Sequence, residues 1–302
     1  MPDFTFITSF FRDGGHLGKN IQTVGRFNQN TEYKWILIDN SSGGDDLTEL
    51  LDDKFTVYKG LNESYVQPLF LKRVSISNAM SLNFGVSKSN TRFICVIDPD
   101  FFVIYPNWID AVMEYMDYSG VGILSAPYHP RWYEKAHRAT GHFMVIDTNF
   151  VPCPLLDFAP SLRDYDPNNK ELPKWVGKRR NLRRFNDCGG QIEKRFASEI
   201  EYLTPLVSPD PDARISATDR ILDSFLPKRW RLTNIDYPVV SARSKGLLPK
   251  IESYYWRGYP FALHLRRYGF VLSGGDVKTI DSEINELLDR VFFGYKNLLE
   301  AR

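Results

Sequence analysis

An apolar run at residues 93–97, which ends in Asp98-Pro99-Asp100, most constrains how this chain can fold. Because polar and apolar residues do not alternate in the run, it is typical of a central strand covered on both faces. Asp98 and Asp100 then lie where the strand leaves the sheet. Ligands of open α/β sheets bind beyond the carboxyl ends of the strands, and paired carboxylates suit Mg²⁺ or Mn²⁺. The run therefore predicts a divalent-metal site in an α/β protein.

Context separates this acid pair from similar ones in the chain. The same spacing recurs at Asp164-Tyr165-Asp166 and Asp210-Pro211-Asp212, in polar, proline-rich surroundings without a preceding apolar run. Only the pair at residues 98–100 is therefore interpreted as a site. A strand-end cap or a turn is the alternative reading of that pair.

The composition fits one large α/β domain or two small ones. The chain has 302 residues, of which 43% are hydrophobic, and this is enough for a sizeable core. Lys and Arg number 38 against 37 Asp and Glu, so the overall charge does not attract the chain to nucleic acid. We expect no nucleic-acid partner.

The N-terminus and the cysteines bear on the compartment. Residues 1–4 are not a basic segment leading into a long apolar one, and no apolar run approaches about 18 residues, so no transmembrane segment is expected. Cys95, Cys153 and Cys188 are odd in number and far apart, which fits a reducing compartment. We expect a cytoplasmic protein and leave open a peripheral attachment to the inner face of a membrane.

Strands and helices alternate along the first half of the chain, as they do in parallel βαβ units. Strands are predicted at residues 4–8, 33–38, 55–58, 93–97, 121–125 and 143–147, and helices at 77–87 and 107–118. A further helix is predicted at 187–202 and a further strand at 230–237. The expected fold class is α/β, with a Rossmann-like, mostly parallel central sheet flanked by helices.

The remaining segments determine the expected domain organisation. Residues 170–184 hold a basic cluster that we interpret as a loop or lid. Residues 279–299 carry apolar residues at helical spacing, which predicts an amphipathic helix packed on the domain or in a homodimer. We expect a single domain at 1–275, with halves at 1–125 and 126–275, and a C-terminal amphipathic helix at 276–302.

Four segments, in their order along the chain, resemble the GT-A glycosyltransferase superfamily in its family-2-like form. They are Thr8-Ser9-Phe10, Ile38-Asp39-Asn40-Ser41-Ser42, the helical residues 78–85 and Asp98-Pro99-Asp100, and the resemblance covers about residues 4–270. It implies a GT-A fold with a C-terminal acceptor region. It also implies a hexosyl- or related transferase that moves a sugar from a nucleotide diphosphate sugar, with UDP as the expected nucleotide, to a glycan or glycoconjugate acceptor.

The resemblance implies a divalent metal, Mn²⁺ or Mg²⁺, on the donor diphosphate, where it stabilises the charge of the leaving group. Asp98 and Asp100 would hold the metal, with Asp100 as the direct ligand and Asp98 reaching sugar hydroxyls or metal-bound water. His264 lies in a segment, residues 259–267, that resembles the one from which these enzymes bring a histidine to the metal. A structural role is the alternative for His264, and it is the expected role of His16, His129, His137 and His142.

The resemblance also suggests which residues contact the nucleotide. Asp39 resembles the acid that accepts a hydrogen bond from the base, although the sequence Asp-Asn-Ser-Ser-Gly-Gly is equally strong turn chemistry. Thr8, Ser9 and Phe10 would line the base and ribose through backbone groups.

Two asparagines in the helix before the acid pair receive different roles. Asn78 and Asn83 lie five residues apart, which is not one helix face, so they cannot point at the same ligand. We expect Asn78 to face the donor and Asn83 to cap or pack.

The acceptor side carries the catalytic candidate. Asp187 precedes Cys188-Gly189-Gly190, a place that resembles the region where many GT-A enzymes hold the acceptor and its base. A carboxylate there could take the proton of the acceptor hydroxyl, and a helix N-cap is the plain alternative. Glu199 and Glu201 are substitutes for this role. Three aromatic residues could stack on sugar rings or belong to the core or rim: Trp132, Tyr133 and Trp256.

Two other functions compete with a transferase. A haloacid-dehalogenase-like phosphatase also has Asp-x-Asp after an apolar strand, with the first Asp as nucleophile. That fold expects the motif at its first strand, whereas three predicted strands precede it here. A non-catalytic carbohydrate-binding relative is the third class, and it would have no use for the acid pair.

Overall fold

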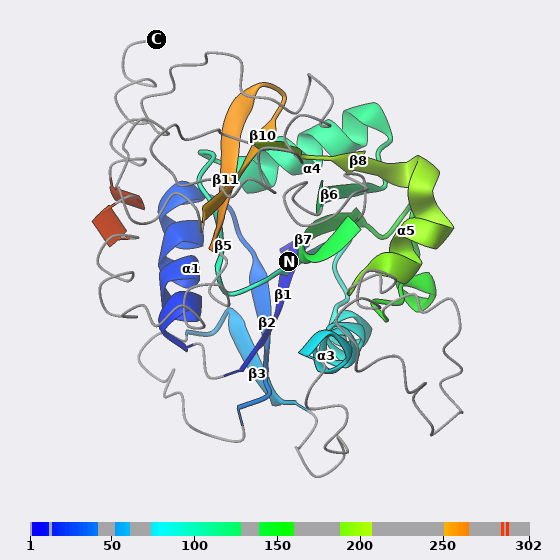
Figure 1. Ribbon diagram of the computed structural model, residues 1–302, viewed down its shortest axis with the longest axis horizontal. Helices are drawn as coiled ribbons and strands as arrows, with labels where there is room; N and C mark the ends of the chain where they lie inside the picture. The colour runs from blue at the N-terminus through cyan, green and yellow to red at the C-terminus, as the bar shows by residue number, and fades with distance from the viewer. Residues whose placement is uncertain are drawn as a thin grey trace, which may run out of the picture.

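The computed structural model describes residues 2–11, 14–41, 52–60, 74–127, 139–159, 188–206, 251–265, 285–286 and 288–289. Its main sheet has seven strands in the order β3-β2-β1-β4-β7-β6-β8 (Figure 1). They are β1 (Phe4–Phe10), β2 (Lys34–Asp39), β3 (Phe55–Lys59), β4 (Phe93–Ile97), β6 (Ile123–Pro127), β7 (Ala139–Asp147) and β8 (Ile200–Tyr202). All neighbouring pairs are parallel except those of β7, which is antiparallel to both β4 and β6. The predicted α/β class with a mostly parallel central sheet is confirmed.

Strand β4 is covered on both of its faces, as the unbroken apolar run predicts. Phe93, Cys95 and Ile97 belong to one hydrophobic core, and Ile94 and Val96 belong to the other. All five side chains are buried. The acid pair that follows the strand therefore starts from a rigid, fully covered element.

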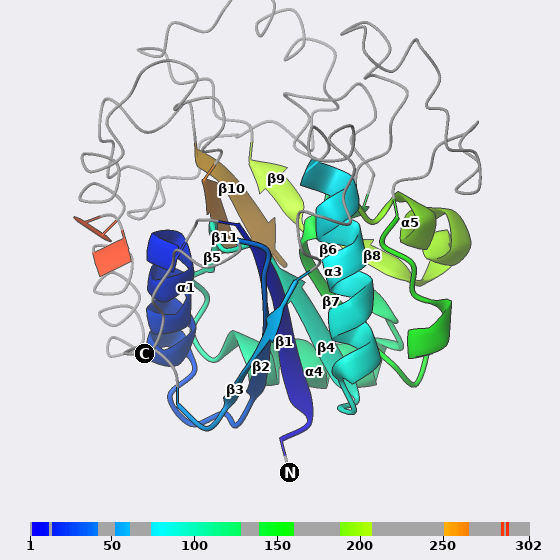
Figure 2. The same ribbon diagram turned by 90° about the horizontal axis from the view of Figure 1, so that it is seen from below.

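Helices cover both faces of the main sheet. Helix α3 (Val74–Lys88) lies on one face, and α1 (Gly14–Phe27) and α4 (Trp108–Ser119) pack into the core of the other face (Figure 2). Helix α3 approaches the sheet closely at Gly85, where a Cβ atom would lie only 2.4 Å from Ile7 Cγ2 and 2.9 Å from Ile38 Cδ1. A Cβ at position 85 would therefore force the side chains of Ile7 and Ile38 to shift.

A second sheet joins the main one directly after the acid pair. It consists of β5 (Phe101–Val103), β11 (Tyr259–Leu265), β10 (Ile251–Trp256) and β9 (Thr204–Leu206), in that order and antiparallel throughout. The Leu265 amide donates a hydrogen bond to the Asp100 carbonyl at 2.9 Å, which ties the end of β11 to the acid pair. Residues 98–100 therefore lie at the junction of the two sheets.

The helix predicted at 187–202 is wrong in its second half. Helix α5 spans only Gly190–Phe196, a 3₁₀ turn follows at Ala197–Glu199, and residues 200–202 form β8. Strand β8 pairs in parallel with β6, and pairing at the edge of an existing sheet overrides the weak helical pattern of these residues. The strand predicted at 230–237 lies outside the described residues.

The predicted C-terminal helix is described only at residues 285–286 and 288–289, which are helical. Leu288 is buried in the core, and Asp289 Oδ1 lies 2.6 Å from Arg26 Nη1 on α1. This part of the helix packs on the domain, and the predicted homodimer stays a prediction. Among the described residues, no helix is long and apolar enough to cross a membrane.

Candidate metal centre

The loop that carries the acid pair is held by the protein backbone and by one buried amide. The Asp98 amide donates to the His142 carbonyl at 2.8 Å. Asn20 of α1 is fully buried, and its Nδ2 lies within hydrogen-bonding distance of three carbonyls, those of Asp98 (3.0 Å), Pro99 (3.3 Å) and Phe101 (3.0 Å). Because these contacts fix the backbone of residues 98–101, they also fix where the two carboxylates start.

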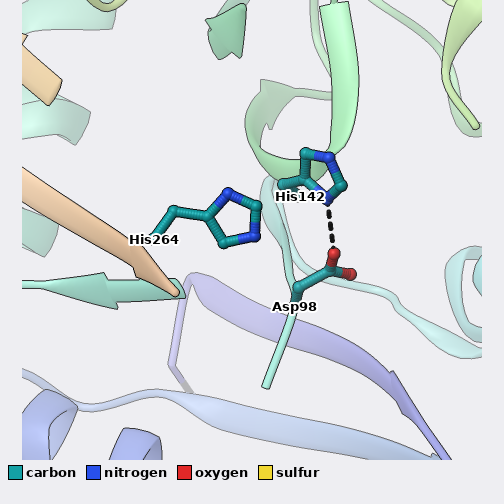
Figure 3. A group of neighbouring side chains, drawn as sticks. All are labelled: Asp98, His142 and His264. Atoms are coloured by element: carbon teal, nitrogen blue, oxygen red, sulfur yellow. Dashed lines mark hydrogen bonds and ion pairs between the residues drawn. The ribbon is translucent and has the colours of Figure 1, made fainter. Parts of the chain in front are cut away.

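Three side chains from different strands form a group with the spacing of metal ligands. Asp98, His142 and His264 each offer one ligand atom, and these atoms lie within 4.8 Å of one another. Asp98 follows β4, His142 lies on β7 and His264 on β11, and the three point toward one another (Figure 3). Asp98 Oδ2 and His142 Nδ1 are 2.6 Å apart, and the two imidazole rings have centroids 4.5 Å apart.

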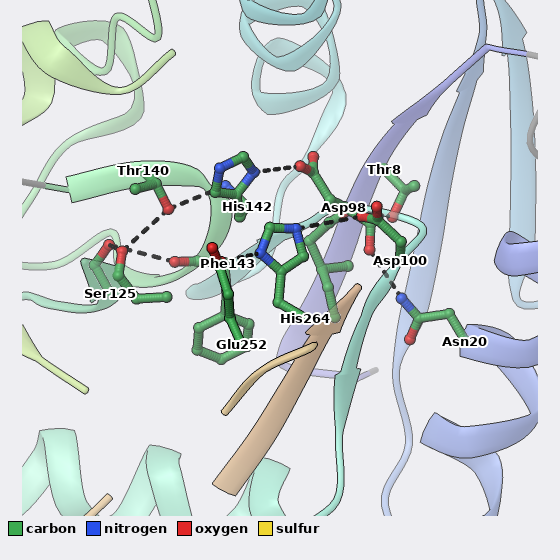
Figure 4. Close-up of polar contacts among 12 residues, drawn as sticks. Thr8, Asn20, Asp98, Asp100, Ser125, Thr140, His142, Phe143, Glu252 and His264 are labelled. Atoms are coloured by element: carbon green, nitrogen blue, oxygen red, sulfur yellow. Dashed lines mark hydrogen bonds and ion pairs between the residues drawn. The ribbon is translucent and has the colours of Figure 1, made fainter. Parts of the chain in front are cut away.

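A row of charged groups continues from this group into the second sheet. Asp100 Oδ1 lies 3.5 Å from His264 Nε2, and His264 Nδ1 lies 3.0 Å from Glu252 Oε2 on β10 (Figure 4). Glu252 is almost completely buried and also accepts a hydrogen bond from the Tyr254 hydroxyl at 3.2 Å. A buried carboxylate needs such partners, because an unpaired one is strongly destabilising.

Electrostatics in this row favour the charged forms of Asp100 and His264. Burial disfavours the imidazolium, but the hydrogen bonds and negative charges of Asp100 and Glu252 outweigh it and raise the pKa of His264 to about 9. Burial would likewise raise the pKa of Asp100, but the hydrogen bond and charge of His264, with the charges of His142 and His16, lower it. A pKa of about 9 corresponds to a protonated His264 at neutral pH.

The donor set fits a hard or borderline divalent cation. Carboxylate oxygens and imidazole nitrogens bind Mn²⁺, whereas thiolates, which the group does not contain, favour softer metals. Glu252 binds Nδ1 of His264, which leaves Nε2 to face Asp100 and the group. A histidine that ligates a metal commonly has its other nitrogen held by a carboxylate in this way. Asp98, His142, His264 and Asp100 are therefore the residues that could hold a metal.

The structure brings together the residues that the sequence predicts as metal ligands, Asp98, Asp100 and His264. Their ligation itself stays a prediction. His142 is expected to be structural, yet it lies in the group, because β7 pairs antiparallel with β4 and brings it beside Asp98. Glu252 is not predicted either, although an acid directly before the aromatic run Tyr254-Tyr255-Trp256 is a signal that it is buried for a reason.

The side chains of the predicted nucleotide-binding strand end are engaged within the protein. Thr8 Oγ1 donates to the Ile97 carbonyl at 2.9 Å and accepts from Trp35 Nε1 at 3.0 Å. Phe10 is buried in the core, and Ser9 Oγ accepts from Asn40 Nδ2 at 2.9 Å. Nucleotide contacts of Thr8, Ser9 and Phe10 through their backbone groups stay a prediction.

Two of the alternatives for polar residues are resolved in part. Asp39 Oδ1 accepts the Ser41 amide at 2.7 Å, which is the Asx-turn contact, and its contact with a base stays a prediction. Asn83 packs, because its amide donates to Asp157 at 3.1 Å and accepts from the Phe158 amide at 2.9 Å. Asn78 Oδ1 is buried and has no hydrogen-bond partner among the described residues, which suits a residue that awaits a polar ligand.

Asp187, the predicted base, and the basic cluster at 170–184 lie outside the described residues. Its neighbour Cys188 is described, and the Cys188 carbonyl accepts the amide of Gly141, the residue before His142, at 2.9 Å. The substitutes are engaged elsewhere: Glu201 accepts a hydrogen bond from Tyr115 of α4, and Glu199 accepts one from Ser198.

No protein-family model matches the chain, and no curated protein matches it. Among solved structures it is similar to TarS 1–349 of S. aureus in complex with UDP-GlcNAc, with 12% identity and a TM-score of 0.33 over 42% of this chain and 34% of that one. It is also similar to the mannosyltransferase PcManGT of Pyrobaculum calidifontis in complex with GDP-Man and Mn²⁺, with 12% identity and a TM-score of 0.37 over 52% of this chain and 48% of that one. The chain thus spans less than half the length of either. At this identity and TM-score, neither likeness assigns an activity or a substrate to it.

Proposed function

We propose that the protein is a metal-dependent glycosyltransferase that moves a sugar, a hexose or a related one, from a UDP-linked donor to a glycan or glycoconjugate acceptor. One observation carries the proposal: Asp98, His142 and His264 converge from three strands at the carboxyl end of β4, with Asp100 beside them. This is the edge where open α/β sheets bind nucleotides. The sequence resemblance to GT-A enzymes supports the same function.

The carboxylates and His264 of the centre, and the residues that support them, have distinct roles in this proposal. The centre would hold a divalent metal, which would supply positive charge to the diphosphate leaving group. Asp98 and Asp100 provide the carboxylate oxygens, His264 provides Nε2, and Glu252 orients the imidazole through Nδ1. Asn20 keeps the loop of the acid pair in place. Asn78, whose buried oxygen has no hydrogen-bond partner among the described residues, would hydrogen-bond the donor.

The acceptor hydroxyl needs a base, and Asp187 is the proposed one. The contact between Cys188 and Gly141 supports this role, because it anchors the chain after Asp187 one residue away from His142. Within the described residues, Glu199 and Glu201 have partners that make them poorer candidates. A near-normal transfer rate in Asp187→Asn protein would remove Asp187 from this role.

A phosphatase that uses Asp98 as a nucleophile is less well supported. Its motif belongs at the first strand, whereas three strands precede β4 within the described residues. The Asp98 carboxylate also contacts His142 at 2.6 Å, which favours a role as ligand or hydrogen-bond acceptor.

The proposal is tested by donor binding and donor hydrolysis. Thermal-shift measurements against a panel of nucleotide sugars with Mn²⁺ should show stabilisation by UDP sugars, because ligands of the native state raise its stability. Asp100→Ala should abolish Mn²⁺-dependent donor hydrolysis or transfer and leave the fold intact, as judged by circular dichroism. Asp52→Asn, which changes an exposed carboxylate paired with Lys54, is the matched control and should behave as wild type. Normal turnover in the presence of EDTA would refute the metal role.

A further inference from the structure

A pocket of about 460 Å³ lies between α4 and the turn that joins β10 to β11. Aromatic side chains form most of its wall: Tyr105, Tyr115, Tyr118, Trp256 and Tyr259. Its volume falls in the range of about 300–1,000 Å³ that is typical of ligand pockets. None of its lining residues belongs to the metal centre.

The pocket is separated from the metal centre along the same hairpin. In the β10–β11 register, Glu252 lies opposite His264, and Trp256 lies opposite Tyr259 at the turn. Glu252 and Trp256 are four residues apart, which corresponds to roughly 14 Å at about 3.4 Å per residue. A ligand in the pocket therefore does not occupy the proposed donor site.

The inner part of the aromatic wall, formed by Tyr105, Tyr115 and Trp256, is held by contacts within the protein. Trp256 is buried and makes edge contacts with Tyr105 and Tyr115, at centroid distances of 5.9 and 5.4 Å. The hydroxyl of Tyr115 donates to Glu201, which holds the ring from its other end. At the mouth of the pocket the rings are open to solvent, since Tyr118 is 93% exposed and Tyr259 is 47% exposed.

Arg257, Glu114 and Ala111 make up the rest of the lining. Arg257 has a φ of 52° and Gly258 a φ of 86°, the combination of a type I′ two-residue turn. This tight turn holds the Arg257 guanidinium 5.0 Å from the centroid of the Tyr115 ring and 6.0 Å from that of Trp256. Glu114 of α4 also lines the pocket, so the lining carries one positive and one negative side chain.

We propose that this aromatic pocket binds an uncharged segment of a glycan and is a second carbohydrate site of the protein. Tyrosine and tryptophan rings offer flat apolar faces for the C–H groups of a sugar ring, together with polar edges. Arg257 and Glu114 can donate to and accept from sugar hydroxyls. A phosphate-bearing ligand would need a surplus of positive charge, which the single Arg–Glu combination does not supply. If the proposed transferase function holds, the pocket would keep a long acceptor near the transfer site, but binding in the pocket does not require that function.

The test uses the full chain and neutral oligosaccharides of glucose, mannose and N-acetylglucosamine. Saturation-transfer NMR should detect binding of at least one of them without metal, and calorimetry gives its affinity. The double variant Tyr118→Ala, Tyr259→Ala should weaken that affinity about tenfold or more, because two stacking faces are lost. Both side chains are exposed, so the fold should persist. Phe150→Ala is the control, because Phe150 is as exposed as Tyr259, at 47%, and lies outside the pocket.

Several results would overturn the proposal: no binding of any of these oligosaccharides, or binding that the double variant leaves within about twofold of wild type. Binding of phosphatidylcholine vesicles that is lost in the double variant, without oligosaccharide binding, would instead assign the rings to a membrane surface. Donor hydrolysis with Mn²⁺ should be unchanged in the double variant. The Asp100→Ala variant tests the transferase function through its loss of donor hydrolysis. It should leave oligosaccharide binding in the pocket unchanged.

Discussion

The protonation of His264 leads to a quantitative prediction about the pH dependence of metal affinity. A metal can bind Nε2 only when that nitrogen is deprotonated, so metal affinity depends on pH. With a pKa of about 9 for His264, most molecules carry this proton at neutral pH. Between pH 6.5 and pH 8.5, the ratio of protonated to neutral His264 falls from roughly 300 to roughly 3, and Mn²⁺ affinity should therefore rise about 75-fold.

The metal-free protein should respond to pH in the opposite direction. The pKa of His264 is raised from 6.5 to about 9 by folding, so its stabilising effect is complete below pH 6.5 and is lost as the pH rises through about 9. A shift of this size corresponds to roughly 3 kcal/mol of unfolding free energy at most. The melting temperature of the metal-free protein should decrease between pH 7 and pH 9, whereas that of the Mn²⁺-bound protein should decrease less.

Calorimetry in buffers of different ionisation enthalpy counts the protons that leave on binding. At pH 7.5 we expect about one proton from His264 per Mn²⁺. Glu252→Gln keeps the shape of the side chain but removes one of the two carboxylates that raise the pKa of His264, so it should reduce the pH dependence. A Mn²⁺ affinity that is independent of pH between 6.5 and 8.5, or binding without proton release, would refute the assignment of His264 as a ligand.

Three substitutions test the supports of the centre and of the fold. Asn20→Ala removes the amide that contacts three loop carbonyls, and Mn²⁺ affinity by calorimetry should fall about tenfold; an unchanged affinity would contradict its positioning role. His142→Ala should likewise weaken Mn²⁺ binding about tenfold or more, and wild-type affinity would leave His142 as a structural residue. Gly85→Ala places a Cβ 2.4 Å from Ile7 Cγ2, so urea unfolding should show a loss of about 1–3 kcal/mol despite the better helix propensity of alanine. Gly25→Ala in α1 is the control, since its Cβ would meet nothing closer than 4.0 Å and should cause no loss.

Much of the main sheet is predictable, because buried strands such as β1, β2 and β4 are marked by apolar runs, whereas β8 at the sheet edge carries no such run. The strands β1, β2 and β4 are covered on both faces. Their sequences are therefore mainly apolar and do not show the strict alternation of polar and apolar residues typical of a half-exposed strand. Helix α1 is not among the predicted elements, since it carries four glycines, Gly14, Gly15, Gly18 and Gly25, which lower helix propensity. Packing of its Leu17, Val24 and Phe27 against the sheet stabilises it instead.

Only some residues of the metal centre can be predicted from the sequence, because the centre is built from segments that lie far apart along the chain. Asp98 and Asp100 are marked by the strand before them, and His264 by a family resemblance. His142 becomes a candidate only once β7 is known to pair antiparallel with β4, which places its backbone beside Asp98. Asn20 acts through carbonyls of another segment, and a contact of that kind leaves no pattern in the sequence.

Glu252 and His264 show why this centre is better explained by function than by stability. Both side chains are buried, and a buried ion pair rarely stabilises a fold more than apolar residues of the same volume would. The surrounding strands could accommodate such residues, because Phe101, Tyr254 and Leu265 already pack there. The contact between Glu252 and His264 fixes which nitrogen of His264 faces Asp98 and Asp100. A contact that contributes little stability but sets this orientation is expected where the nitrogen has to bind a cation. The same carboxylates that hold the proton in the metal-free protein would orient the imidazole once the proton has left.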